Sequence, residues 1–419
     1  RSKFAGYLER RTEIESEAKL LIERTSGAVE QHVVSTLPDT PLHTSLFDLA
    51  RMPATDHNHV ELLINGHHTF ESITNGIANA SSYIFFQFYI LRDDDLGQRL
   101  CNNLMERAQS GVKVYVLYDE IGSSPFDDSR LMKKLEKAGV HVAPFNTTQG
   151  WKNPLQLNFR NHRKVVVVDG LRAWIGGHNV GNEYLGLNKK IGAWRDTHAM
   201  FEGPAVLAAE LAFATDWRWA TGEHLEVDWD FERPDKGSSA VLVFPSDPAS
   251  NYEEVGLMFH HLIVSAKERI WIATPYFVPD RAIISALQLA ALRGIDVRII
   301  LPEKCDSRVV GLANWAFTKE LIPVGVQFFR YCSGFMHQKV LLMDDDLASV
   351  GTANFDNRSI RLNFEISLLV EGDVFAAEVE QMLEHDMLQC REVSEEEISE
   401  QPTWFTLATA AARLVSPLL

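Results

Sequence analysis

Two stretches of this 419-residue chain carry the same polar residues at the same spacing, and this duplication limits the folds open to it. Each copy has a His, a Lys two residues later, an Asp seven residues after the His and an Asn seventeen residues after it. The two copies are His162, Lys164, Asp169 and Asn179, and, 175 residues further on, His337, Lys339, Asp344 and Asn354. A repeat of this kind predicts one structural unit present twice, with the copies in equivalent positions.

Apolar runs at 165–168 and 340–343 follow the His and Lys of each copy. Such runs are typical of strands buried on both faces, and strand side chains two residues apart point to the same side. Each His and its Lys are therefore expected to share one face. Gly176 and Gly351 end the next predicted strand, and the turn after each presents the Asn of that copy. Each half thus gathers an imidazole, an ammonium and an amide in one small space.

Predicted helices and strands alternate around these motifs, as in an α/β sheet with helices on its faces. Strands are predicted over 60–64, 83–90, 112–118, 270–274 and 297–301. Helices are predicted over 68–80, 96–109, 128–137, 252–267, 280–292 and 309–321. We therefore expect two similar α/β/α lobes, each a mixed sheet flanked by helices. A pseudo-two-fold axis would relate the lobes, with the active site between them.

The length leaves room for two or three domains, at roughly 100–200 residues each. A helix is expected over 8–30 and a loop over 35–58. Pro, Gly, Ser and charged residues collect near 231–238, which predicts a boundary between the lobes there. The expected divisions are an N-terminal helix and linker (1–57), a first lobe (58–235), a second lobe (236–400) and an apolar tail (401–419).

Two such halves facing each other would gather a cluster of cations that repel one another unless an anion lies between them. A phosphodiester is such an anion. The groups expected to bind its non-bridging oxygens are Lys164, Lys339, Asn179 and Asn354. The two motif histidines, His162 and His337, would face each other across phosphorus, one attacking in line and the other protonating the leaving alkoxide. No metal or other cofactor is implied, because no carboxylate cluster has the spacing of a magnesium or calcium site.

Each catalytic His also needs an acceptor on its second ring nitrogen, which fixes the tautomer and stabilises the cation. Asp196 and Glu365 are the candidates, because each lies downstream of one motif on a predicted strand. The motif acids Asp169 and Asp344 are further catalytic candidates. They close apolar strands before turns, however, so capping of the backbone is the favoured role for them.

The net charge of −17, from 57 acidic and 40 basic residues, limits the partners of the chain. It argues against a broad basic surface for nucleic acid and against simple electrostatic adhesion to anionic lipid. It does not argue against an anionic substrate, because the motif Lys, Asn and His residues concentrate positive potential locally. The oligomeric state is left open.

These motifs are similar to those of the phospholipase D superfamily, whose mark is two H-x-K-x4-D motifs. Within it the chain most resembles the bacterial cardiolipin synthases. The similar segments are NHRKVVVVDG, IGGHNVGNEYLG, ATPYFVPD and MHQKVLLMDDDLASVGTANFDNRSIRLNFE. The resemblance covers about residues 58–419. One departure is Gly177, where many members carry Ser, and Thr352 holds the same place in the second copy.

The resemblance implies a two-step transfer through a phosphohistidine. His162 would attack the phosphate of one phosphatidylglycerol, and His337 would protonate the departing glycerol. The hydroxyl of a second phosphatidylglycerol would then attack the phosphatidyl-enzyme, which gives cardiolipin. The acids that pair with the motif histidines in the superfamily would correspond to Asp196 and Glu365.

Two alternatives stay open. A hydrolase of the same superfamily differs only in that water reaches the covalent intermediate, and residue patterns alone do not exclude it. A lipid-binding scaffold without activity has no need for both His, so the complete pair of motifs weighs against it. Whether the acceptor is phosphatidylglycerol or phosphatidylethanolamine is also left open.

A phospholipid substrate implies contact with the bacterial membrane. Members of the family usually begin with one or two transmembrane helices, and this chain starts at Arg1 without Met. We therefore expect an anchor outside this chain and a catalytic region on the cytoplasmic side of the inner membrane. The apolar composition of the tail predicts either a helix at the membrane interface or a helix packed on the core. Aromatic residues near the first motif would line an acyl groove or pack in the core: Trp151, Phe159, Tyr184 and Trp194.

Overall fold

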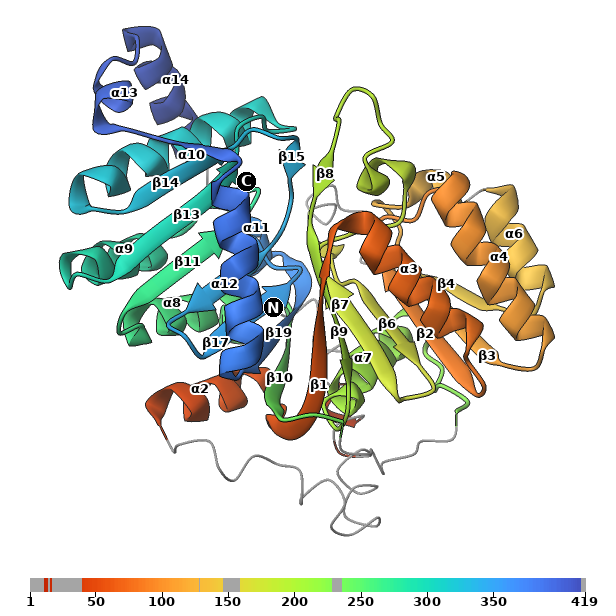
Figure 1. Ribbon diagram of the computed structural model, residues 1–419. Helices are drawn as coiled ribbons and strands as arrows, with labels where there is room; N and C mark the ends of the chain where they lie inside the picture. The colour runs from red at the N-terminus through yellow and green to blue at the C-terminus, as the bar shows by residue number, and fades with distance from the viewer. Residues whose placement is uncertain are drawn as a thin grey trace.

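The protein folds around one continuous mixed sheet with helices on both faces (Figure 1). The computed structural model describes residues 11–13, 16, 40–127, 129–145, 159–227 and 236–415. Most of the predicted helix over 8–30, most of the predicted boundary at 231–238, and Trp151 lie outside the described residues.

The first half of the sheet has the strand order β4-β3-β2-β6-β7-β9-β1. Its strands are β1 (Thr55–Ile64), β2 (Tyr83–Phe88), β3 (Lys113–Asp119), β4 (His141–Phe145), β6 (Val165–Val168), β7 (Arg172–Gly176) and β9 (Thr197–Glu202). β2, β3 and β4 run parallel to one another, whereas β6, β7, β9 and β1 pair antiparallel. The motif strand β6 therefore lies near the middle of this half.

The second half repeats this order as β14-β13-β11-β16-β17-β19-β10, with β20 added at its edge. Its strands are β10 (Ser239–Ser246), β11 (Arg269–Ala273), β13 (Asp296–Pro302), β14 (Gln327–Tyr331), β16 (Val340–Met343), β17 (Leu347–Gly351), β19 (Asn363–Glu371) and β20 (Cys390–Glu392). The halves join where the equivalent strands β1 and β10 pair antiparallel. Antiparallel pairing of equivalent strands is what a pseudo-two-fold axis requires.

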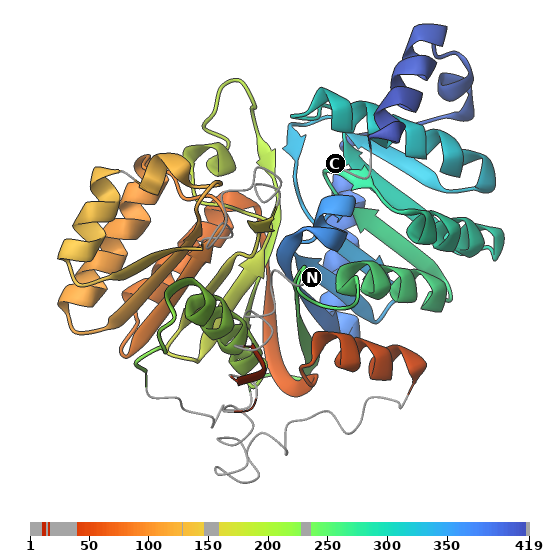
Figure 2. The same cartoon turned by 180° about the vertical axis from the view of Figure 1, so that it is seen from behind.

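Each half has helices on both faces of its sheet. In Figure 1 the near face carries α3, α4 and α12, and in the opposite view of Figure 2 the near face carries α7 and α8. The helices of the first half are α3 (Asn65–Ala78), α4 (Asp95–Gln109), α5 (Ser124–Asp127), α6 (Arg130–Lys137), η3 (Asn182–Leu185) and α7 (Val206–Thr221). Those of the second are α8 (Glu254–Ser265), α9 (Arg281–Leu292), α10 (Arg308–Leu321), η4 (Ile322–Val324), α11 (Asn357–Arg361) and α12 (Asp373–Met387).

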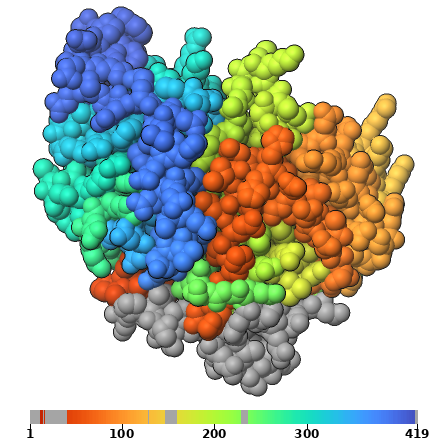
Figure 3. All heavy atoms as spheres, in the orientation of Figure 1, coloured from red at the N-terminus to blue at the C-terminus, as the bar shows by residue number. Residues whose placement is uncertain are grey.

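Apolar side chains fill three cores. One lies under α3, α4 and α6, and a second lies under α8, α9 and α10. The third spans both halves, because it joins side chains of α7 and α12 to the central strands of each half-sheet. In the space-filling view α12 lies against the first half (Figure 3), where it contacts β1. The two halves are therefore held together by shared apolar packing as well as by the sheet.

The predicted helices and strands between residues 60 and 321 are confirmed to within a few residues at their ends. The prediction of a loop over 35–58 is wrong, because α2 (Pro41–Ala50) lies within it and β1 begins at Thr55. A capping signal was present in the sequence. The side chain of Thr40 accepts a hydrogen bond from the amide of His43, and Pro41 stands at the first helical position.

Two short helices follow α12: α13 (Glu395–Ser399) lies at the end of the expected second lobe, and α14 (Thr403–Leu414) lies in the tail. Phe405 packs edge-on against Trp315, and the guanidinium of Arg413 lies over the ring of Phe317, so α14 rests on α10. Trp404 and Leu407 are exposed. No helix within the described residues is long and apolar enough to cross a bilayer.

Candidate active site

Each motif histidine is held by backbone bonds to the opposite half of the protein. The short strand β5 (Arg160–Asn161) precedes His162 and pairs parallel with the start of β19. The equivalent strand β15 (Phe335–Met336) precedes His337 and pairs parallel with β8 (Trp194–Arg195) of the first half. The amides of His162 and His337 continue these ladders by donating to the carbonyls of Phe364 (2.9 Å) and Arg195 (2.8 Å).

Because of this exchange of strands, each motif histidine pairs with an acid of the opposite half. Nδ1 of His162 lies 2.9 Å from Oε2 of Glu365 in the second half. Nδ1 of His337 lies 2.9 Å from Oδ2 of Asp196 in the first half. All four side chains are nearly or completely buried. The acid that orients each imidazole is therefore brought in by the other copy of the motif, and the sequence left this pairing open.

The two acids are held by different neighbours. Glu365 accepts hydrogen bonds from the hydroxyls of Thr352 and Ser359 (2.5 and 2.8 Å) and from the amide of Asn363 (3.0 Å). Asp196 accepts one from the backbone N–H of Thr197 at 2.8 Å. The residue that matches Thr352 is Gly177, where an added Cβ would stand 2.0 Å from Oδ1 of Asp196. The departure from the family pattern therefore leaves room for the acid.

Burial and the neighbouring charges set the ionisation of these groups. Burial lowers the pKa of His162 and of His337 to about 4, although the paired acid opposes this in each case. Burial acts to raise the pKa of Glu365, but the charge and hydrogen bond of His162 outweigh it and lower that pKa to about 2. The pKa of Asp196 also lies below its usual range, because nearby cations outweigh its burial. Both acids are thus ionised beside imidazoles that are neutral before an anion binds.

The two motif lysines lie behind the histidines, and neither lines the open cavity. Nζ of Lys164 donates to the carbonyl of His162 at 2.6 Å. The same nitrogen lies 5.4 Å from the ring centre of Tyr89. Nζ of Lys339 lies 2.9 and 3.1 Å from the ring nitrogens of His337. Burial lowers the pKa of both ammonium groups, to about 8 for Lys339. Both lysines are therefore placed to add positive charge at the base of the site.

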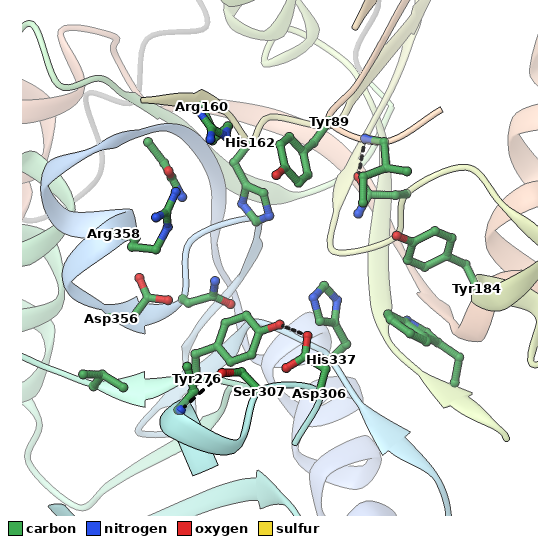
Figure 4. Close-up of a pocket in the computed structure, with 17 residues that line it drawn as sticks. Tyr89, Arg160, His162, Tyr184, Tyr276, Asp306, Ser307, His337, Asp356 and Arg358 are labelled. Carbon is green, nitrogen blue, oxygen red and sulfur yellow. Dashed lines mark hydrogen bonds between the residues drawn. The ribbon is translucent and has the colours of Figure 1, made fainter. Parts of the chain in front are cut away.

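The histidines open onto a cavity of about 430 Å³, within the usual range for a ligand site. Figure 4 shows the two imidazole rings pointing into the same space from opposite sides. Asn179 and Asn354 also line it. Oδ1 of Asn179 accepts a hydrogen bond from the amide of Ile90, and its side chain also hydrogen-bonds Tyr184. The structure thus brings both His and both Asn to one cavity, as the motif spacing predicted.

A family model described as "Cardiolipin synthase, PLD-like domain" matches residues 73–211 and 259–387, more than half of the chain. The chain belongs to this family. The two matched segments contain the two motifs, so each copy of the repeat carries one phospholipase D-like unit.

Two curated relatives support the same assignment for this phospholipase D-like chain. Cardiolipin synthase A of one Pseudomonas fluorescens strain is 44% identical over 422 residues, covering 100% of this chain and 88% of the relative. Cardiolipin synthase A of a second strain of that species is 47% identical over 371 residues, covering 88% and 77%.

Among solved structures, the phosphatidylserine synthase of Haemophilus influenzae matches with a TM-score of 0.67. It is 17% identical, with 91% of this chain and 100% of that chain covered. At this identity the match concerns the fold alone, and it confirms the architecture of two α/β lobes with a mixed sheet.

The motif acids Asp169 and Asp344 do not line the cavity of this phospholipase D-like site. Each has a positive φ (53° and 52°) and closes a turn after its motif strand. Oδ1 of Asp169 accepts from the amides of Ser82 and Tyr83 at 2.7 and 3.0 Å, and Asp344 binds the amides before β11 in the same way. Their geometry is that of backbone caps, which gives no support to a catalytic role for either.

Several residues that line the cavity were not singled out by sequence reasoning. They are Tyr89, Arg160, Tyr276, Asp306, Asp356 and Arg358. Two aromatic candidates, Tyr184 and Trp194, do line the cavity, whereas Phe159 packs against the central core. The only advance signal for Arg160 and Arg358 was their closeness to the motifs, two residues before His162 and four after Asn354.

Proposed function

We propose that this protein is a phosphatidyltransferase that makes cardiolipin from two molecules of phosphatidylglycerol and releases glycerol. The observation that carries the proposal is the pair of buried histidine–carboxylate contacts that open onto one cavity. Such a pair supplies a nucleophile and an acid on opposite sides of one phosphorus atom. The likeness to cardiolipin synthase A of Pseudomonas fluorescens points to the lipid acceptor.

In the first step we assign His162 as the nucleophile, as the family resemblance implies. Its Nε2 forms a bond to phosphorus while the bond from phosphorus to the glycerol oxygen breaks. His337 gives a proton to that oxygen, so glycerol leaves as a neutral alcohol. Glu365 keeps the proton on Nδ1 of His162 and stabilises the positive charge that the ring gains.

In the second step a hydroxyl of another phosphatidylglycerol attacks phosphorus. His337, now neutral, accepts the proton of that hydroxyl as the P–N bond breaks and His162 is restored. Asp196 stabilises the cationic form of His337 that results. Atoms and charges balance over the two steps, and His337 ends each turnover protonated, as it began.

The low pKa of His337 requires that substrate raise it before the first step. A phosphodiester between the two histidines brings a negative charge within a few ångströms of the ring, which favours the imidazolium. Lys164, Lys339, Asn179 and Asn354 would bind the non-bridging oxygens and stabilise the charge that builds up on them in the transition state. Substrate binding thus raises the pKa of His337, and the ring takes up from solvent the proton that it gives to glycerol in the first step.

The proposed substrate lies in a bilayer, so the protein must work at a membrane. We propose the cytoplasmic face of a bacterial inner membrane. The bacterial relatives and the family match support this location.

The test is purified protein with phosphatidylglycerol vesicles. We expect cardiolipin and glycerol to appear in equal amounts, measured by mass spectrometry of the lipids and an enzymatic glycerol assay. Phosphatidic acid without cardiolipin would show a hydrolase instead. His162→Ala and His337→Ala should each lose at least about 10³-fold in rate, since each removes a group that acts in the transition state.

The division of roles has its own test. The His337→Ala variant should still form the P–N bond slowly and accumulate phosphatidyl-enzyme, which is detectable by acid-labile label from radioactive lipid. The His162→Ala variant should accumulate none. The opposite pattern would reverse the two roles while leaving the reaction class unchanged.

A further inference from the structure

Two arginines, Arg160 and Arg358, line the cavity together with the catalytic histidines. Among the described residues that line it, they provide the only guanidinium or ammonium groups. Arg160 lies on β5 of the first half and Arg358 on α11 of the second half. Figure 4 shows both on the side of the cavity next to His162.

Both guanidinium groups also act on one hydroxyl. Burial raises the pKa of Tyr89, and the charges of Arg160 and Arg358 both oppose that rise. Tyr89 lines the same part of the cavity, so the two arginines form one positive wall rather than two separate charges.

This wall is not duplicated, although the catalytic groups are. The residue 175 positions after Arg160 is Phe335, and the residue 175 positions before Arg358 is Glu183. Phe335 packs against the ring of Trp194 (4.9 Å between centroids), and Glu183 pairs with Arg92 outside the cavity lining. The cavity is therefore symmetric in the groups that make and break bonds and asymmetric in its wall. Arginines that occur in only one half can serve a step in which the two substrate molecules play different parts.

The proposed reaction has one such difference, and the inference rests on that reaction. The donor lipid places its phosphate between the histidines, and the acceptor lipid places a hydroxyl there. The acceptor also carries a phosphate, and in cardiolipin a single glycerol separates the two phosphates. Both must therefore lie close together when the second bond forms.

We propose that Arg160 and Arg358 form a second phosphate site, which holds the phosphodiester of the acceptor phospholipid while its glycerol hydroxyl attacks. Guanidinium groups suit this role because they bind phosphate oxygens with two parallel hydrogen bonds. The reacting phosphate has separate partners in the motif lysines behind the histidines. The second site favours a phospholipid over water or free glycerol as acceptor, and so favours synthesis over hydrolysis.

Two carboxylates also line the cavity, and both have partners of their own. Asp356 caps α11 by accepting from the amide of Ser359 at 2.7 Å, and Asp306 accepts from the hydroxyl of Tyr276 at 2.6 Å. In Figure 4 Asp306 and Tyr276 lie beside His337, away from Arg160. Asp356 lies beside Arg358 in the same view, and the charge of Arg358 acts to lower its pKa, so the wall carries two guanidinium groups and one carboxylate.

The test compares two reactions of one covalent intermediate. Exchange of radioactive glycerol into phosphatidylglycerol uses one lipid phosphate per turnover, whereas cardiolipin formation uses two. Arg160→Gln and Arg358→Gln should each lower cardiolipin formation by at least about tenfold, the worth of a charge-assisted hydrogen bond. Glycerol exchange should change less than about threefold, and it also shows that the variants fold.

Two further measurements sharpen the result. In mixed micelles the deficit should shrink as the mole fraction of phosphatidylglycerol rises, because a weakened acceptor site fills at higher surface concentration. Arg281→Gln is the matched control, since Arg281 is an exposed arginine on α9 that pairs with Glu320 outside the cavity lining. It should leave both reactions unchanged.

An equal loss of exchange and synthesis in the arginine variants would overturn the inference, because the arginines would then hold the reacting phosphate. No loss of either reaction would overturn it too. Wild-type protein that exchanges glycerol but makes no cardiolipin would refute the proposed function itself, a result that the variants cannot mimic.

Discussion

At the scale of single residues, the two imidazoles have the same chemistry and different supports. Glu365 accepts hydrogen bonds from three neutral side chains, those of Thr352, Ser359 and Asn363, whereas Asp196 accepts from the backbone amide of Thr197 and the indole N–H of Trp194 and lies near cations. Neutral donors hold a carboxylate in place without competing for its proton. We relate this difference to the proposed roles of the two histidines. The nucleophile His162 must be oriented more narrowly toward phosphorus than His337, which only transfers a proton.

Lys339 gives the site a dependence on alkaline pH. Burial lowers the pKa of Lys339 to about 8. The amine is therefore charged below that pH and loses its positive charge as the pH rises through it. Phosphate binding needs the charged form. We therefore expect kcat/KM for phosphatidylglycerol, which reports groups of the free enzyme, to fall above pH about 8.

The measurement is initial rate against pH from 6 to 9.5, with vesicle binding followed at each pH as the control. Constant vesicle binding with a falling rate would assign the loss to the site. A profile that stays flat to pH 9.5 would show that Lys339 keeps its proton, and the link between its charge and binding would be wrong.

Much of the site followed from the sequence at this scale. The equal spacing of the two motifs predicted that both His and both Asn meet, because a strand fixes which side chains share a face. The crossed pairing of Asp196 and Glu365 did not follow, since it depends on contacts between segments far apart in the chain. Arg160 and Arg358 gave no pattern of their own, because each occurs once.

At the scale of elements, α14 exposes several large apolar side chains to solvent. Trp404, Leu407 and Leu414 are 67%, 70% and 83% exposed, while other side chains of the same helix pack on α10. Figure 3 shows α13 and α14 projecting beyond the body of the molecule. A helix that rests on the body by one side and exposes aromatic and aliphatic side chains on another suits the interface of a membrane. The structure confirms a helix packed on the body, and contact of its exposed side with a membrane stays a prediction.

We expect the triple change Trp404→Ser, Leu407→Ser and Leu414→Ser to weaken binding of this chain to phosphatidylglycerol vesicles. Lost burial of three large apolar side chains should lower the bound fraction by at least about tenfold in flotation. The rate in detergent micelles, where substrate is dispersed, should stay within about twofold, because α14 contributes no residue to the cavity.

The matched control is Leu292→Ser, an exposed leucine (72%) on α9. It should leave flotation unchanged. Equal flotation of the triple variant and the unaltered protein would remove α14 from the membrane contact. Binding that disappears in moderate salt would point to charged residues instead.

At the scale of the whole molecule, buried ion pairs join the two halves. Arg195 on β8 of the first half makes two hydrogen bonds of 2.7 Å to Asp386 on α12 of the second. The same Asp386 accepts from Gln338, the residue between His337 and Lys339. The joint between the halves is therefore connected directly to the second motif.

Removal of one partner of such a pair leaves a buried charge without compensation. We expect Asp386→Ala to lower the free energy of unfolding by about 3–5 kcal/mol, whereas Arg195→Met with Asp386→Leu should cost much less. Denaturant unfolding followed by tryptophan fluorescence measures both. Equal unfolding midpoints for Asp386→Ala and the unaltered protein would contradict the role given to the pair.

At this scale the sequence allowed the duplicated fold to be predicted, but not the joining of the two sheets into one. Alternating elements and the repeat predicted two α/β lobes, but not that β1 and β10 would merge their sheets into one. That junction depends on backbone pairing between segments more than 180 residues apart, such as Thr55 with Val241. The helix α2 was missed for a simpler reason, because a polar stretch outweighed the Thr-Pro capping signal.

The strand exchange between the halves has a consequence for how the protein is made. A ribosome completes the first half long before residue 365 exists, so a nascent His162 has no carboxylate to orient it. A partly synthesised or truncated chain therefore carries no competent phosphate-cleaving centre, even when its first half is folded. We therefore expect unfinished copies of the protein to leave phospholipid intact until the second half has folded onto the first.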